Sequence, residues 1–100
     1  MNQQAMMRLK KMQKQMMDAQ KQLEETVFTG SAGGGMVTVE MKGTHEVLSV
    51  TIDPEALESK EDIEMIQDSI VAALNDANRK LESESQKLLG GFGGGLGGLF

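Results

Sequence analysis

The first quarter of the chain repeats its apolar residues with the spacing of a helix. They recur at alternating steps of four and three residues, at Ala5, Leu9, Met12, Met16, Ala19 and Leu23. Those steps keep the side chains on one helical face, and Met6, Met7 and Met17 widen that stripe. The residues between are mostly Gln, Lys and Glu, which favour helices, and neither Gly nor Pro interrupts them. The pattern predicts a helix over residues 2–25, roughly 36 Å long.

Beyond this helix the apolar period changes to that of a strand. Residues 26–29 predict a short strand, and the glycine-rich residues 30–35 predict a loop. Residues 36–42 alternate apolar and polar side chains, and residues 47–52 do so again after a turn at Gly43. The apolar positions of these two strands are Val37, Val39, Met41, Leu48, Val50 and Ile52. Such alternation predicts a small antiparallel sheet with one apolar face.

A second helix is predicted after the sheet. Asp53 and Pro54 suit the N-cap and first position of a short helical turn over residues 55–57. Residues 59–62 resemble a capping box, with Asp in place of the usual Glu. An apolar seam then follows helical spacing at Ile63, Ile66, Ile70, Ala73, Ala77, Leu81 and Leu88. The seam predicts a helix over about residues 60–89.

The order helix, three strands, helix predicts an α+β fold in one small domain over residues 1–89. Seven of the last eleven residues are glycine, so residues 90–100 are predicted to form a flexible tail. Both helices are longer than the average of about 11–12 residues. A three-stranded sheet is too small to cover both apolar seams, and we therefore expect a dimer.

Charge is distributed unevenly along the chain. Residues 1–23 hold five bases and one acid, a formal charge of +4, whereas residues 24–100 carry −9. The bases of the first helix are Arg8, Lys10, Lys11, Lys14 and Lys21, of which the first and third lie away from the common stripe of the others. An ordinary solvated face mixes both signs, so this segregation indicates an anionic partner. Arg79, Lys80 and Lys87 form a weaker basic group beside Glu82 and Glu84.

The chain offers little for catalysis or cofactor binding. It has no cysteine, and its single histidine, His45, stands beside a turn where a solvated or hydrogen-bonded surface role is expected. The glycines at 33–35 lead into a strand, whereas phosphate-binding glycines open a helix. Acidic residues between 55 and 68 complement the start of the second helix. We predict no enzyme activity, cofactor, metal or small-molecule substrate, and neither a secretory signal nor a membrane span is recognisable.

Four segments together resemble the YbaB/EbfC family of bacterial nucleoid-associated proteins. They are MQKQMMDAQKQLEE, GSAGGGMVTVEMKG, VTIDPEAL and EDIEMIQDSIVAALNDANRK. The two helical patterns recur elsewhere, whereas GGGMVTV and IDPE in this order between such helices are more specific. The resemblance extends from about Met6 to Leu89.

The resemblance implies an α-β-β-β-α fold and a homodimer joined through the sheet region, with helices that project like tweezers. It also implies a cytoplasmic, nucleoid-associated protein that binds double-stranded DNA with little sequence preference and has a chromosome-organising or regulatory role. The family's contacts on its long terminal helices correspond here to the basic residues of both helices. The apolar strand positions between 37 and 52 correspond to the dimer interface. Residues 24–100 carry a charge of −9, unlike strongly basic architectural proteins. This charge would repel phosphate and predicts weaker, more salt-sensitive binding to DNA.

A chaperone-like or adaptor module is the alternative interpretation. Two long amphipathic helices with methionine-rich seams also suit a dimer that grips polypeptides, because methionine packs adaptably against varied surfaces. In that case Met6, Met7, Met12 and Met16 would make the contacts, and the lysines would only confer solubility. Reversal of charge at Lys10 and Lys14 separates the two interpretations.

Overall fold

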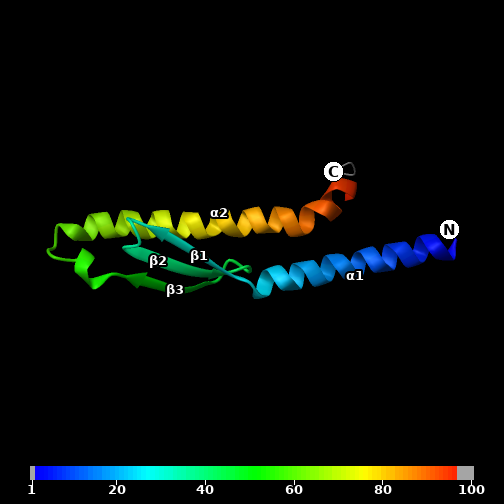
Figure 1. Cartoon of the computed structure of the whole chain (residues 1–100), viewed down its shortest axis with the longest axis horizontal. Helices are drawn as coiled ribbons and strands as arrows, with labels where there is room; N and C mark the ends of the chain where they lie inside the picture. The colour runs from blue at the N-terminus through cyan, green and yellow to red at the C-terminus, as the bar shows by residue number, and fades with distance from the viewer. Residues whose placement is uncertain (1, 97–100) are drawn as a thin grey trace.

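One long helix runs along a small sheet and the other extends beyond the end of that sheet in the computed structural model, which describes residues 2–96 (Figure 1). The elements, in chain order, are α1 (Gln3–Glu25), β1 (Val27–Ala32), β2 (Val37–Lys42), β3 (Val47–Ile52), the 3-10 turn η1 (Pro54–Ala56) and α2 (Asp62–Leu96). The predicted α-β-β-β-α order is therefore confirmed. The described part measures 70 × 23 × 16 Å, because both helices run along the same axis.

Helix α1 begins and ends within one residue of its prediction. The Asn2 side-chain oxygen accepts a hydrogen bond from the Ala5 backbone N–H at 2.7 Å, which caps the first turn. At the other end Thr26 is extended, and its N–H donates to the carbonyl oxygens of Gln22 and Leu23. Leu23 is buried in the core, whereas every residue from 6 to 15 is exposed. The outer half of α1 thus projects beyond the sheet (Figure 1).

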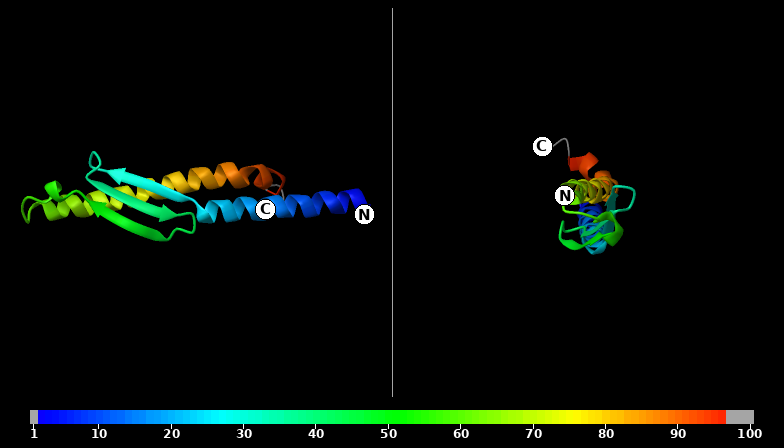
Figure 2. Two further views of the ribbon diagram at one scale, coloured as in Figure 1. Left: turned by 60° about the horizontal axis from the view of Figure 1, so that its bottom comes forward. Right: turned by 90° about the vertical axis from the view of Figure 1, so that its left-hand side faces the viewer.

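The sheet is antiparallel with the strand order β1-β2-β3, and α2 lies against one of its faces (Figure 2). Helix α2 packs on β1 and β2 but makes few contacts with β3. The core lies in that contact and contains Leu23, Phe28, Val37, Val39, Met41, Ala73, Ala77 and Leu81. Because α2 covers only two of the three strands, the same face of β3 stays open.

Two glycines allow close backbone contacts that position both helices. A Cβ added at Gly30 would meet the Ala73 carbonyl oxygen and the Ala77 nitrogen of α2. One added at Gly43 would meet the Leu23 carbonyl oxygen at the end of α1. Any side chain larger than hydrogen at these two positions would therefore push a helix away from the sheet.

Some element boundaries differ from the sequence prediction. Strand β1 continues to Ala32, because the helix closely approaches Gly30 and Ser31 pairs with Thr38. The hairpin loop that follows contains Gly33–Gly35, all with positive φ (65°, 67° and 90°). Helix α2 begins at Asp62, whose carboxylate accepts hydrogen bonds from the backbone N–H groups of the two residues 58 and 59.

The end of the second helix was predicted too early. Helix α2 continues past 89 to Leu96, so residues 90–96 of the predicted tail are helical. Leu88 and Leu89 pack against the core, and beyond this anchored turn each added residue gains one backbone hydrogen bond, which offsets the low helix propensity of the glycines. Residues 97–100 lie outside the described part, and the flexibility of the tail stays a prediction. No helix in residues 2–96 combines the length and apolarity that a membrane crossing requires.

Candidate nucleic-acid interface

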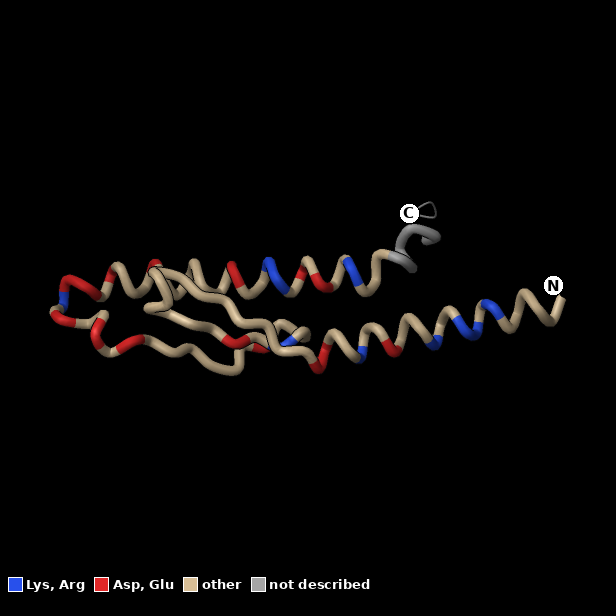
Figure 3. Tube along the Cα trace, in the orientation of Figure 1, with Lys and Arg blue, Asp and Glu red and all other residues tan. Residues whose placement is uncertain are grey.

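Opposite charges gather at opposite ends of the molecule (Figure 3). Lys and Arg residues gather in the outer half of α1, near the N-terminus. Asp and Glu residues gather at the far end, around η1 and the first turns of α2. The acidic residues there are Glu55, Glu58, Glu61, Asp62, Glu64 and Asp68. The charge asymmetry of the sequence thus becomes a polarity along the 70 Å axis.

The basic residues of α1 are free to meet a partner. All five are exposed, and none of them takes part in an ion pair within residues 2–96. Lys10, Lys14 and Lys21 are four and seven residues apart, which places them on one side of the helix. Lys11 and Arg8 project toward neighbouring sides, so the outer part of α1 presents positive charge over much of its circumference. Such a rod suits an extended anionic surface.

The basic residues of α2 are in a different environment. Lys80 donates a hydrogen bond from Nζ to the Thr29 carbonyl oxygen at 2.8 Å and lies 3.4 Å from Asp76 Oδ2. The Arg79 guanidinium lies 3.5 Å from the other oxygen of Asp76. Lys80 is thereby held at the sheet edge, and one carboxylate partly compensates the charge of both residues. Lys87 is exposed and takes part in no ion pair in the described part of the chain.

Asp76 also holds the outer edge of β1. The Ser31 backbone N–H donates to Asp76 Oδ2 at 3.0 Å, and this hydrogen bond is the main reason that the pKa of Asp76 lies below its usual value. A hydrogen bond and positive charge from Lys80 lower the pKa further, while desolvation opposes them. Strand β1 is an edge of the sheet, and Asp76 and Lys80 pair two of its otherwise open backbone groups, the Ser31 N–H and the Thr29 carbonyl oxygen. The sequence pattern did not predict this role of Asp76.

The predicted dimer-interface residues separate into two groups. Val37, Val39 and Met41 are buried beneath α2 and belong to the core of the chain itself, so their side chains offer no surface to a partner. Leu48, Val50 and Ile52 of β3 remain 45%, 43% and 37% exposed. The alternation identified apolar positions correctly, but α2 covers β2 and leaves β3 uncovered.

The apolar side chains of α1 also fall into two groups, one partly buried and one exposed. Leu23 is buried, and Met16 and Ala19 of the seam are half-buried. Met7 and Met17 do not widen this seam: they are 68% and 71% exposed, the highest values among the large apolar side chains of residues 2–90. Their spacing from the lysines, three and four residues, was visible in the sequence and could have separated them from the seam.

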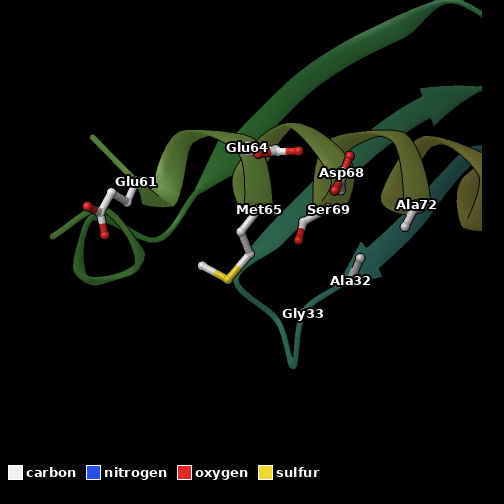
Figure 4. Close-up of a pocket in the computed structure, with 8 residues that line it drawn as sticks. All are labelled: Ala32, Gly33, Glu61, Glu64, Met65, Asp68, Ser69 and Ala72. Atoms are coloured by element: carbon white, nitrogen blue, oxygen red, sulfur yellow. The ribbon is translucent and has the colours of Figure 1, made fainter. Parts of the chain in front are cut away.

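The other candidate chemistry lies apart from these bases. His45 stands in the β2–β3 turn with φ 73°, and its Nε2 lies 3.3 Å from Glu82 Oε1, which confirms a hydrogen-bonded surface residue. The loop with Gly33–Gly35 is a hairpin. Beside it is an open hollow between the hairpin and α2, toward which Met65 and Ser69 point (Figure 4).

This hollow is a poor site for phosphate. Its lining includes the carboxylates of Glu61, Glu64 and Asp68, which repel anions. Within residues 2–96 no three His, Cys, Asp or Glu side chains are grouped so as to hold a metal ion. The outer part of α1 is therefore the surface of the described chain best suited to an anionic polymer.

Comparison with known proteins agrees with this geometry. Residues 1–96 match the model of the YbaB/EbfC DNA-binding family. A nucleoid-associated protein of Chloroflexus aurantiacus is 44% identical over 101 residues, with all of both chains covered. One of Legionella pneumophila is 48% identical over 86 residues, covering 86% of this chain and 75% of the relative. The crystal structure of the uncharacterized protein HP0035 from Helicobacter pylori has a TM-score of 0.71 at 30% identity, covering 92% of this chain and 97% of that one. The chain belongs to the YbaB/EbfC DNA-binding family.

Proposed function

We propose that this protein is a nucleoid-associated protein that binds double-stranded DNA as a homodimer, mainly through phosphate contacts from α1. The observation that carries the proposal is the group of exposed bases on the projecting half of that helix, with no ion pair in the described residues. Relatives 44% and 48% identical are named nucleoid-associated proteins. Their names support association with the nucleoid. The chromosome-organising or regulatory role and the cytoplasmic location are part of the proposal, and no catalytic step is proposed.

The mechanism is electrostatic. Lysines that approach the duplex release counterions condensed on its phosphates, and this release supplies affinity without reading the base sequence. If four bases of each α1 engage, a dimer makes about eight phosphate contacts, and the log–log salt slope is roughly −7. The acidic end of the molecule repels phosphate, which would direct the duplex to α1 and away from the sheet.

The proposed homodimer uses the open side of β3. Leu48, Val50 and Ile52 leave an apolar surface on this strand, and Val47 adds to it at 43% exposure. Strand β3 is also an edge of the sheet, whose unpaired backbone groups invite a neighbour. A second copy packed symmetrically on this strand would cover both features. Val37, Val39 and Met41 of the neighbouring strand β2 would support the interface from the side, as core residues on the same face of the sheet.

The test is a fluorescence-anisotropy titration of a labelled random 30-base-pair duplex across a series of salt concentrations. Lys10→Glu/Lys14→Glu removes two contacts per subunit and adds repulsion, so binding should be lost at moderate salt. Lys42→Glu/Lys60→Glu makes the same change of charge on the body of the protein, away from the outer half of α1, and should retain most of the affinity. Equal losses in both variants would show that only net charge matters, and no duplex binding by the folded wild type would refute the proposal.

A polypeptide-binding module remains the second candidate. It is favoured by the exposure of Met6 and Met12, which are 48% and 47% accessible although they lie near the apolar side of α1. Under this hypothesis Lys10→Glu/Lys14→Glu would leave the binding of an unfolded apolar polypeptide nearly intact, because methionine contacts do not depend on lysine charge. The same two variants, titrated with unfolded casein in place of DNA, separate the two functions.

A further inference from the structure

The exposed side of α1 carries its own regular pattern, distinct from the apolar seam. Met7, Lys10, Lys14, Met17 and Lys21 follow one another at steps of three, four, three and four residues. That spacing keeps them on a single stripe, which we call the lysine stripe. At about 100° per residue, its centre lies about 160° around the helix from the centre of the seam that ends at Leu23, so the two stripes lie on nearly opposite sides of α1.

Methionine is unexpected on this stripe. Met7 and Met17 are the most exposed large apolar side chains within residues 2–90, whereas polar side chains usually occupy a face that meets only water. Each also lines a shallow surface hollow beside a lysine. Met7 shares one with Gln3, Met6 and Lys10, and Met17 shares another with Asp18, Gln20, Lys21 and Glu24. Packing within the chain does not account for either methionine.

The neighbouring charges determine what can cover these methionines. A partner that buries Met7 must also meet Lys10, which lies three residues away on the same stripe. One that buries Met17 must also meet Lys14 and Lys21, three and four residues away. The lysine stripe of a second copy would bring like charges together, and a neutral surface would leave the lysines without partners. A DNA groove satisfies both kinds of side chain, because two rows of phosphates border sugars and base edges.

We propose that Met7 and Met17 make apolar contacts with sugars and base edges in a DNA groove while the lysines of the stripe hold the phosphates on either side. This inference rests on the proposed DNA binding and specifies which face of α1 does it. The two methionines are ten residues apart, about 15 Å along the helix, so they reach separate positions along the duplex. Methionine is flexible and is among the apolar side chains that proteins insert between base steps.

The two kinds of contact respond differently to salt. Phosphate contacts release counterions and set the slope of affinity against salt concentration, whereas an apolar contact releases none. Removal of the methionines should therefore lower affinity equally at every salt concentration and leave the slope unchanged. Removal of a lysine should change the slope.

The test compares wild type with Met7→Gln/Met17→Gln in the anisotropy salt series. Glutamine has a similar length, carries no charge and favours helices, so α1 should be preserved. We expect affinity to fall roughly tenfold at each salt concentration, with an unchanged slope. Met7→Leu/Met17→Leu restores an apolar side chain and should recover most of the loss. Met65→Gln changes a methionine that is 46% exposed and lies off the stripe, and should bind as wild type does.

Each other result overturns the inference. Wild-type affinity in Met7→Gln/Met17→Gln would mean that the methionines do not touch DNA, although the DNA-binding function itself would stand. A shallower slope in this variant would mean that they act only by positioning lysines. An altered sedimentation coefficient with unchanged DNA affinity would assign them to contacts between copies. Failure of the wild type to bind DNA would remove both this inference and the proposed function.

Discussion

The contact between α2 and β1 predicts a large effect for a very small substitution, Gly30→Ala. The added methyl group would overlap the Ala73 carbonyl oxygen and the Ala77 nitrogen. Both are backbone atoms, so no flexible side chain can rotate away, and α2 itself must move off the strand. That movement would also lengthen the 2.8 Å hydrogen bond from Lys80 to Thr29.

The magnitude follows from the rigidity of the contact. Added methylenes in a packed core typically cost about 1–3 kcal/mol, and a clash between two backbones should lie at the upper end, about 3 kcal/mol. A domain with a total stability of about 5–15 kcal/mol would lose a large part of it. The assay is urea unfolding followed by circular dichroism, at a fixed protein concentration because a dimer's stability depends on concentration.

A matched glycine provides the control. Gly90 lies in α2, and a Cβ added there meets no atom within 4 Å. Gly90→Ala should therefore stabilise the protein, by up to about 1 kcal/mol, since alanine favours helices more than glycine does. A Gly30→Ala protein that unfolds at the same urea concentration as wild type would refute the close packing of α2 on β1.

Two further predictions concern the sheet edges. The pKa of Asp76 is lowered from 3.8, so its stabilising contribution is complete above that pH and is lost as pH falls through the lower pKa of the folded protein. In Asp76→Asn the free energy of unfolding, measured with urea at pH 2–6, should therefore decrease less as the pH falls. An unchanged pH dependence would contradict the role of the hydrogen bond from Ser31 to Asp76. Val50→Lys places a charge on the open face of β3 and should give monomers in sedimentation, whereas Thr51→Lys on the opposite face should not. A dimeric Val50→Lys protein would exclude this face as the interface.

Local patterns predicted α1 almost completely. Its seam, the Asn2 cap and the extended Thr26 depend on neighbouring residues, so no distant contact was needed to locate its ends. The turn at Pro54 was similarly local, because Asp53 accepts a hydrogen bond from the Glu55 N–H at 3.0 Å. These are the elements in which spacing and capping chemistry act within a few residues.

Distant contacts decided the features that the sequence did not predict. Ser31 reads as part of a loop, yet it is held in β1 through Asp76, 45 residues later in the chain. The alternation in β2 and β3 is similar, and only the path of α2 makes Val39 a core residue while Val50 remains exposed. Apolar spacing identifies a face but not the element that covers it.

The candidate DNA-binding residues were predictable only where their environment is local to the helix. Segregated charge identified the bases of α1 because no acid pairs with them in the described structure. In α2, Asp76 precedes Arg79 by three residues and Lys80 by four, a spacing that indicates helical ion pairs and was visible in the sequence. The hydrogen bond from Lys80 to the backbone of β1 depends on the fold and could not be predicted from the sequence.

The methionines provide the most direct test of the central claim, that DNA lies on the outer half of α1. Methyl-labelled methionines can be followed by NMR while a random 30-base-pair duplex is added to the protein. We predict the largest shifts for Met7 and Met17, on the lysine stripe, and small ones for Met41 in the core and Met65 at the acidic end. Shifts concentrated at Met65, or a spectrum that duplex DNA leaves unchanged at low salt, would contradict the account.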